Sequence, residues 1–348
     1  MKNTLPVLSC VGLLLAPALA VAGAADKKLD VYWVDVEGGA ATLVVTPAGE
    51  SVLFDTGYPG DRDAERIRKA VLETAGLKQI DYLVVTHFHI DHFGGIPDIV
   101  KRVPIGTIYG RDFASAAETE HKDPKAVAFT EAKIKKVVIK PGDKLPLKQA
   151  KGAAPLTFQF VGANETFVPM KGAKPNPEIC KEHKARDPDK SDNRNSVVTL
   201  VTFGPWRFFE GGDLTWNTEN TLVCPKNNVG APVDVFQSEH HGLDQSNNPV
   251  LVKTLQPNVV VVNNGPKKGG EAGALATLKG TPSVKTVYQL HRSVKLTAEQ
   301  NTAPELIANM DEACTGNLIK LSVDPSGKSY AVSVPATKHE KTYATLAK

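Results

Sequence analysis

Apolar residues in this chain gather in short blocks that polar or glycine-rich turns separate. Blocks rich in branched and aromatic residues predict strands at 29–34, 41–46, 51–54, 82–85, 105–109, 156–161, 197–203, 206–209, 233–237, 257–264, 284–288, 318–323 and 330–334. Helical spacing of apolar positions predicts helices at 63–74, 96–103 and 125–136, and a helical segment near 303–309. Strands and helices mixed in this way predict a layered α/β architecture.

Potential metal ligands follow three of the predicted strands. Six residues share this placement: His87, His89, Asp91, His92, Asp213 and His240. The first four follow the strand at 82–85, and the other two follow the strands at 206–209 and 233–237. Buried ionisable groups are costly unless they are paired or bound to a cation. Core packing therefore does not explain so dense a group.

The ends of neighbouring strands converge in a layered α/β fold, and ligands gather there. Imidazole and carboxylate groups together bind zinc, manganese or iron. No GxSxG turn, Walker loop or cysteine beside a base offers another nucleophile. We therefore expect a hydrolase in which a metal-bound hydroxide attacks the substrate. Asp91 or Asp213 would hold the attacking water.

The run His87-Phe88-His89-Ile90-Asp91-His92 resembles the HxHxDH signature of the metallo-β-lactamase superfamily. The resemblance implies a four-layer αββα sandwich and one or two divalent ions, zinc or alternatively manganese. It places His87 and His89 on one ion, Asp91, His92 and His240 on the other, and Asp213 between them. Asp55 matches the superfamily's strand-end aspartate, which we expect to orient a ligand rather than bind metal.

One ligand of the superfamily pattern is missing. A further histidine commonly precedes the bridging aspartate, but only His121 and His183 lie in that interval, and neither ends a predicted strand. The chain instead has Asn193-Arg194-Asn195-Ser196 before the strand at 197–203, and we place Asn195 beside the ligands. This departure resembles the exported hydrolase domain of the competence DNA-uptake protein ComEC and its free-standing relatives.

The remaining histidines and some basic residues are predicted to lie near the site or elsewhere in the fold, without binding metal. We expect His241 behind His240, because His240 is nearer the strand, and we interpret His291 as a structural histidine. Arg292 and the pair Lys267-Lys268 could bind an anionic substrate, although exposed basic residues usually have no such specific task.

The N-terminus carries an apolar run from Leu5 to Val21 with small residues after it. This pattern predicts an export signal at residues 1–24 that is removed in the mature protein, and Pro6, Pro17 and the short length argue against a retained anchor. We expect a periplasmic or secreted protein without a membrane span. Residues 25–348 would form one metallo-β-lactamase-fold domain with an inserted, proline-containing loop at about 162–195.

Cysteines and charge limit the remaining possibilities. Cys180, Cys224 and Cys314 allow one disulfide and a free thiol, or no bridge at all. A net charge of +3 and 6% aromatic residues predict no strong nucleic-acid binding.

The subgroup resemblance favours a phosphodiester or a related ester as substrate. A small-molecule β-lactam or lactone is the alternative. A non-catalytic metal-binding envelope protein is the hypothesis from another class, favoured if the incomplete ligand set leaves no open reactive position. The sequence leaves the oligomeric state open.

Overall fold

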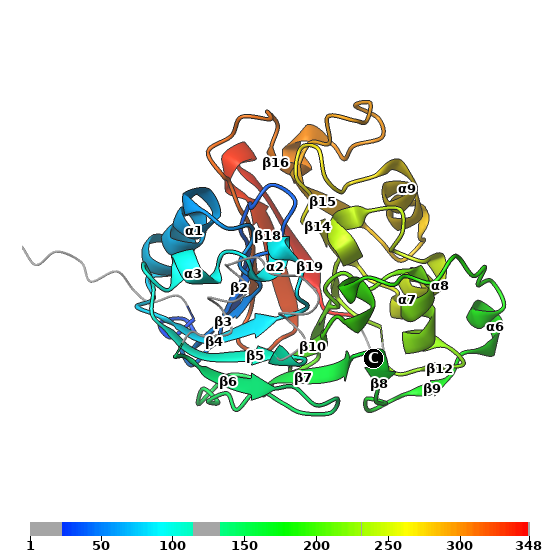
Figure 1. Ribbon diagram of the computed structural model, residues 1–348, viewed down its shortest axis with the longest axis horizontal. Helices are drawn as coiled ribbons and strands as arrows, with labels where there is room; N and C mark the ends of the chain where they lie inside the picture. The colour runs from blue at the N-terminus through cyan, green and yellow to red at the C-terminus, as the bar shows by residue number, and fades with distance from the viewer. Residues whose placement is uncertain (1–22, 114–132, 231, 347–348) are drawn as a thin grey trace, which may run out of the picture.

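Two large mixed sheets lie face to face in the computed structural model, which describes residues 23–113, 133–230 and 232–346 (Figure 1). All but the last two residues of the expected export signal at 1–24 fall outside the described residues. Within the described ranges, no helix has both the length and the apolar character needed to cross a membrane.

The first sheet has nine strands in the order β19-β18-β17-β1-β2-β3-β4-β5-β6. In chain order they are β1 (Leu29–Trp33), β2 (Thr42–Val45), β3 (Ser51–Phe54), β4 (Ile80–Val85), β5 (Ile105–Gly110), β6 (Lys135–Val138), β17 (Ile319–Val323), β18 (Ser329–Val334) and β19 (His339–Ala344). Strands β3 to β6 run parallel, and the other neighbours are antiparallel. The carboxyl ends of β3 and β4 therefore open on the same edge.

The second sheet has eight strands in the order β16-β15-β14-β13-β11-β10-β7-β8. They are β7 (Leu156–Ala163), β8 (Thr166–Phe167), β10 (Val198–Phe203), β11 (Trp206–Glu210), β13 (Val235–Gln237), β14 (Val259–Val262), β15 (Thr286–His291) and β16 (Ile307–Asn309). The strands from β11 to β16 run parallel. The ends of β11 and β13 therefore also share an edge.

An apolar core fills the space between the sheets. Trp33 of β1 packs edge-on against Phe208 of β11, with 5.9 Å between the ring centroids, and Phe54 stacks on Phe158 at 6.1 Å. The outer faces are covered by α1 (Asp61–Arg68) and α3 (Ile96–Ile99) on the first sheet, and by α7 (Trp216–Val223), α8 (Pro249–Leu255) and α9 (Ala272–Gly280) on the second (Figure 1). The layers are those of the expected αββα sandwich.

Three expected elements differ from the structure. The helix expected at 125–136 falls mostly outside the described residues, and its described end forms β6, which pairs with β5. The segment near 303–309 is a short 3-10 turn followed by β16, because Ile307 and Asn309 pair with β15. The closing hairpin gains a third strand, β19, whose mostly exposed side chains give no apolar pattern.

The segment at 162–195 contains short elements. After β7 and β8 come β9 (Lys174–Pro175), which pairs with β12 (Lys226–Asn227), then α6 (Pro177–Cys180) and the 3-10 turn Asp192–Asn195. A disulfide joins Cys180 to Cys224 at the end of α7, while Cys314 is not bridged. Of the two alternatives that the sequence leaves open, the structure has the single bridge.

Candidate metal centre

Sharp turns at the strand ends aim the polar side chains into one space. The backbone is left-handed at Asp55 after β3, with φ of 58°, and at Gly212 after β11, with φ of 64°. A Cβ atom at Gly212 would lie 2.9 Å from the Cβ of Thr86, which follows β4. Only glycine therefore lets these two strand ends approach so closely.

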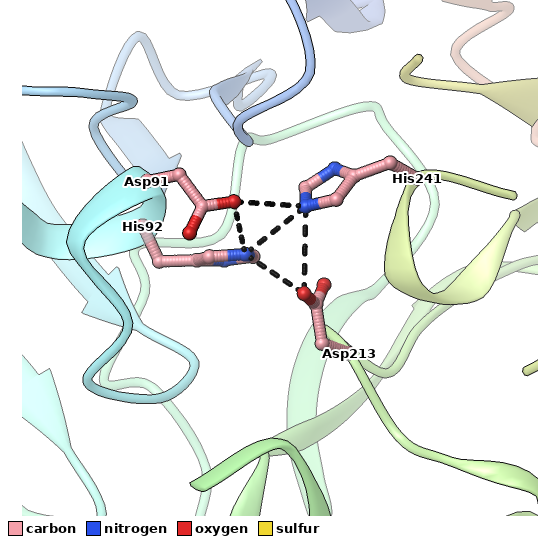
Figure 2. Close-up of side chains that lie close together, drawn as sticks. All are labelled: Asp91, His92, Asp213 and His241. Atoms are coloured by element: carbon pink, nitrogen blue, oxygen red, sulfur yellow. Dashed lines mark hydrogen bonds and ion pairs between the residues drawn. The ribbon is translucent and has the colours of Figure 1, made fainter. Parts of the chain in front are cut away.

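Four buried side chains, Asp91, His92, Asp213 and His241, converge at this edge (Figure 2). Nε2 of His92 lies 3.1 Å from Oδ2 of Asp213 and 3.3 Å from Nε2 of His241. Nε2 of His241 lies 3.2 Å from Oδ2 of Asp91 and 3.4 Å from Oδ2 of Asp213. Two of the residues follow a strand of the first sheet and two follow strands of the second. We call them the four-residue cluster.

A neighbouring group consists of His87, His89 and Asp213. Nε2 of His87 lies 2.9 Å from Nδ1 of His89 and 3.8 Å from Oδ2 of Asp213. The carboxylate of Asp213 is thus common to both groups, as a residue that bridges two ions must be.

His240 and His241 differ from their expected positions in the site. His241, expected behind the ligands, belongs to the four-residue cluster, and His240, expected as a ligand beside Asp91 and His92, does not. Both residues lie in the 3-10 turn Glu239–Gly242 with left-handed backbones, and their rings are 6.0 Å apart. This tight turn points the two side chains in different directions, so nearness to the strand does not indicate which one enters the cluster.

His240 instead approaches Asp213 from beside Asn193. Its Nε2 lies 3.4 Å from Oδ2 of Asp213 and 3.5 Å from Nδ2 of Asn193. Oδ1 of Asn193 is buried and accepts no hydrogen bond from the described residues. Asn195, the residue expected beside the ligands, donates to Asp192 at 3.0 Å. The 3-10 turn that contains both asparagines therefore presents Asn193, two positions earlier, to the site.

Asp55 lies behind His92 and orients it. Oδ2 of the buried Asp55 is 2.7 Å from Nδ1 of His92, and its two oxygens accept hydrogen bonds from the backbone N–H and the hydroxyl of Thr86. With the His92 proton on Nδ1, the lone pair of Nε2 faces the four-residue cluster. The contacts of Asp55 are thus with His92 and Thr86.

Lys268 lies in the site. The sequence analysis predicted only that it could bind an anionic substrate. Its ammonium group forms an ion pair with Asp91 and lies 3.4 Å from the hydroxyl of Tyr58. One third of the side chain remains exposed, at 33%. Lys268 and Asp91 are 177 positions apart, so no local pattern could have paired them.

Burial and mutual charge set the protonation of these groups. Burial, and then the charge of His92, lower the pKa of His87 well below its usual value. Burial lowers the pKa of His240 to about 4, although Asp213 opposes the change. Burial would raise the pKa of Asp213, but the charges of His241, His92 and His240 hold it well below its usual range. A charged Asp213 carboxylate and a neutral His87 imidazole are in the protonation states that bind metal.

His92 behaves differently in the absence of a cation. Burial would lower its pKa, but the charges of Asp213, Asp55 and Asp91 raise it well above the usual value. Three buried carboxylates around the His92 imidazole are stabilised by a positive charge nearby. A bound cation would supply this charge in place of the second imidazole proton. Two imidazole nitrogens and two carboxylates are also a suitable donor set for zinc or manganese. The four-residue cluster therefore fits a divalent metal ion.

Comparison with known proteins agrees with this geometry. Residues 34–163 match the family described as the metallo-beta-lactamase superfamily. The chain is 26% identical over 269 residues to ComE operon protein 3 of Bacillus subtilis, which covers 73% of this chain and 30% of that protein. It is 26% identical over 228 residues to competence protein ComA of Neisseria gonorrhoeae, covering 66% of this chain and 26% of that protein. A metal-dependent hydrolase of Polynucleobacter asymbioticus is 29% identical over 140 residues, covering 40% and 47%.

The fold, the family match and the donor cluster agree with one another. The chain contains a metallo-β-lactamase domain, which the family model matches over residues 34–163, and its relatives include a metal-dependent hydrolase. Within the superfamily, its similarity is to the ComEC-like subgroup of competence proteins. The matches span less than half the length of each of these relatives.

Proposed function

We propose that this chain is exported and hydrolyses a phosphodiester or a related ester with the help of one or two divalent ions. The main support for a hydrolase function is the four-residue cluster, in which strand ends of both sheets bring buried carboxylates and imidazoles together. The partly exposed ammonium group of Lys268 beside this cluster supports an anionic ester such as a phosphodiester as the substrate.

The two ligand groups would bind the ions, and two of their carboxylates would also orient the attacking water. Asp91, His92, Asp213 and His241 would hold one ion, and His87, His89 and Asp213 a second. When bound, a divalent ion lowers the pKa of a water molecule and polarises the bond to be cleaved. Asp213 and Asp91 would accept hydrogen bonds from the attacking water and so fix its direction. His240 lies beside Asp213 and contacts Asn193.

Lys268 favours an anionic substrate over a neutral one. Burial would lower its pKa, but the charges of Asp91 and Asp213 raise it, so the ammonium group is charged at neutral pH. A partly exposed cation beside the reactive edge can contact a phosphoryl oxygen. A neutral lactone would not make this ionic contact.

Two chromogenic substrates test the proposal. The full chain, purified and loaded with zinc or manganese, is assayed with bis-p-nitrophenyl phosphate and with nitrocefin. We expect hydrolysis of the phosphodiester alone. Turnover of nitrocefin alone would favour the β-lactam alternative, and bound metal without either activity would favour the metal-binding envelope protein. A chain that binds no metal would overturn the whole assignment.

Paired histidine variants test the site itself. His241→Ala removes a member of the four-residue cluster, so we expect loss of the ion bound there and loss of hydrolysis. His339→Ala is the matched control, because that histidine contacts Tyr288 from β19, outside both ligand groups. Full metal content in His241→Ala would contradict the assigned ligand set.

Export is the part of the proposal that rests on the apolar run at residues 5–21. Expression of the full chain followed by cell fractionation should recover it outside the cytoplasm, beginning near residue 25. A chain that lacks residues 2–24 should stay in the cytoplasm. Retention of the full-length, uncleaved chain in the cytoplasm would contradict export.

A further inference from the structure

A third group of potential metal ligands, Asp35, His291 and Cys314, lies outside the centre described above. Asp35 follows β1, His291 ends β15, and Cys314 lies between β16 and β17. Oδ1 of Asp35 is 2.8 Å from Nε2 of His291. Sγ of Cys314 is 3.2 Å from Oδ2 of Asp35 and 3.8 Å from Nε2 of His291. Residues up to 279 positions apart thus bring a carboxylate, an imidazole and a thiol together.

The surroundings of the three side chains suit a bound ion. Asp35 and His291 are fully buried, whereas Cys314 is partly exposed and is not in a disulfide. The buried pair would be held in place by the fold, and the exposed side at Cys314 would let an ion enter from solvent. None of the three belongs to either ligand group of the hydrolase centre.

We propose that Asp35, His291 and Cys314 form a separate, thiolate-containing site for a divalent metal of the zinc type. Carboxylate oxygen, imidazole nitrogen and thiolate sulfur all bind zinc. In tetrahedral coordination such ligand atoms lie roughly 3.3 to 3.8 Å apart. The 3.8 Å between Sγ of Cys314 and Nε2 of His291 lies in this range, and the 2.8 Å between Oδ1 of Asp35 and Nε2 of His291 has to open by about 0.5 Å.

Arg66 holds the parts of this site together. Its Nη1 donates to Oδ2 of Asp35 at 2.9 Å, and its Nη2 donates to the carbonyl oxygen of Cys314 at 3.1 Å. The positive charge of Arg66 opposes a nearby cation, but Glu37 offsets that charge, with 3.1 Å between Oε1 and Nη2. Oδ1 of Asp35 accepts one hydrogen bond from the backbone N–H of Glu37 at 2.9 Å and faces His291, so a second lone pair is left for the metal.

The thiol is protonated while no metal is present. Burial, together with the charge of Asp35, raises the pKa of Cys314. Binding of a divalent ion forms a metal–sulfur bond and releases the thiol proton to solvent, with no change in oxidation state.

The bound ion would stabilise the backbone next to the hydrolase centre. It would connect the loop around Cys314 to the turn after β1, and this turn packs under the four-residue cluster. The N–H of Ala40 in that turn donates to the carbonyl oxygen of Asp91 at 3.1 Å. The new site is therefore structural in character, and it adds a constraint on the backbone that carries Asp91.

Cobalt(II) titration of the full chain with its Cys180–Cys224 disulfide intact tests the site, because a near-ultraviolet charge-transfer band arises only when a thiolate is a ligand. The hydrolase centre contains no sulfur among the described residues. We expect the band in the wild type, its loss in Cys314→Ser and its weakening in His291→Gln. It should persist in Cys10→Ser and in His241→Ala. Absence of the band from the wild type, or its survival in Cys314→Ser, overturns the proposal.

A second measurement needs no variant. The rate at which a chromogenic disulfide modifies Cys314 in the native chain is compared with and without zinc. We expect zinc to slow the reaction at least about tenfold, because a coordinated thiolate is a poor nucleophile, and magnesium, which prefers oxygen ligands, to leave it unchanged. Equal rates with and without zinc would contradict metal binding at this thiol.

Discussion

Asp55 binds no metal in the proposed centre, yet it decides how a ligand is presented. Its carboxylate meets Nδ1 of His92 at 2.7 Å while it holds the backbone N–H of Thr86 at 2.8 Å. The first contact sets the tautomer of His92, and the second fixes the carboxylate itself. Residues of this kind commonly tune metal affinity without touching the ion.

Asp55→Asn should lower metal affinity by about 10- to 100-fold and leave the fold intact, because an amide is a poorer acceptor for the Nδ1 proton. Competition with a chromogenic chelator measures the affinity. Asp81→Asn is the matched control, since Asp81 accepts from the backbone N–H of Ser51 at the opposite end of the same strands. Equal losses in the two variants would show that Asp55 acts only through general stability.

At the scale of elements, one buried carboxyl group joins two helices behind the site. Glu219 of α7 accepts hydrogen bonds from the N–H groups of Asn247 and Asn248, both at 2.7 Å, just before α8 begins. Burial raises the pKa of Glu219 to about 8, although these hydrogen bonds oppose the change. The connection between the helices therefore contains a group that titrates near neutral pH.

The sign of the resulting pH dependence follows from proton binding. The folded chain keeps the Glu219 proton up to pH of about 8, whereas the unfolded chain loses it above the ordinary value of 4.5. The unfolded state binds fewer protons in this window, so the stabilising contribution is complete below pH 4.5 and is lost as the pH rises to about 8.

Glu219→Gln should remove this contribution to the pH dependence. Between pH 5 and 8 the unfolding free energy of the wild type should fall relative to the variant by up to about 1.4 kcal/mol per pH unit. Urea unfolding of both proteins at several pH values measures the difference. Parallel curves for the two proteins would mean that Glu219 is already ionised in the folded chain.

At the scale of the whole molecule, the proposed ion would join the two sheets. Asp91 and His92 follow β4 of the first sheet, and Asp213 and His241 follow β11 and β13 of the second. Any ligand that binds only the folded state stabilises it, by RT ln(1 + [L]/Kd) for one site. A bound ion would therefore also link the two sheets of the sandwich.

Addition of zinc to the chelator-treated chain should raise the unfolding free energy by about 2.7 kcal/mol when free zinc is 100 times the Kd of the site. Denaturant unfolding at fixed free zinc measures this change. His241→Ala should lose most of it, because the ion would have lost a ligand from the second sheet. An undiminished response in His241→Ala would place the stabilising ion elsewhere.

Much of the fold could be predicted because strands and turns are encoded locally. Blocks of apolar residues located β1 to β4, β10 and β11 to within a residue or two at most ends. β6 and β19 were missed because their side chains are largely exposed, and only pairing with β5 and β18 makes them strands. Where a strand depends on its neighbour rather than on its own pattern, the sequence carries little signal.

The sequence by itself determined which side chains stand at the strand ends, since Asp55 follows its apolar block directly and the HxHxDH run and Asp213 follow theirs after short polar or glycine-containing links. Only the tertiary structure decided which of them meet. His241 rather than His240 enters the four-residue cluster, Asn193 rather than Asn195 faces it, and Lys268 pairs with Asp91. These outcomes depend on side-chain directions in tight turns and on the packing of two sheets, neither of which has a local signature in the chain.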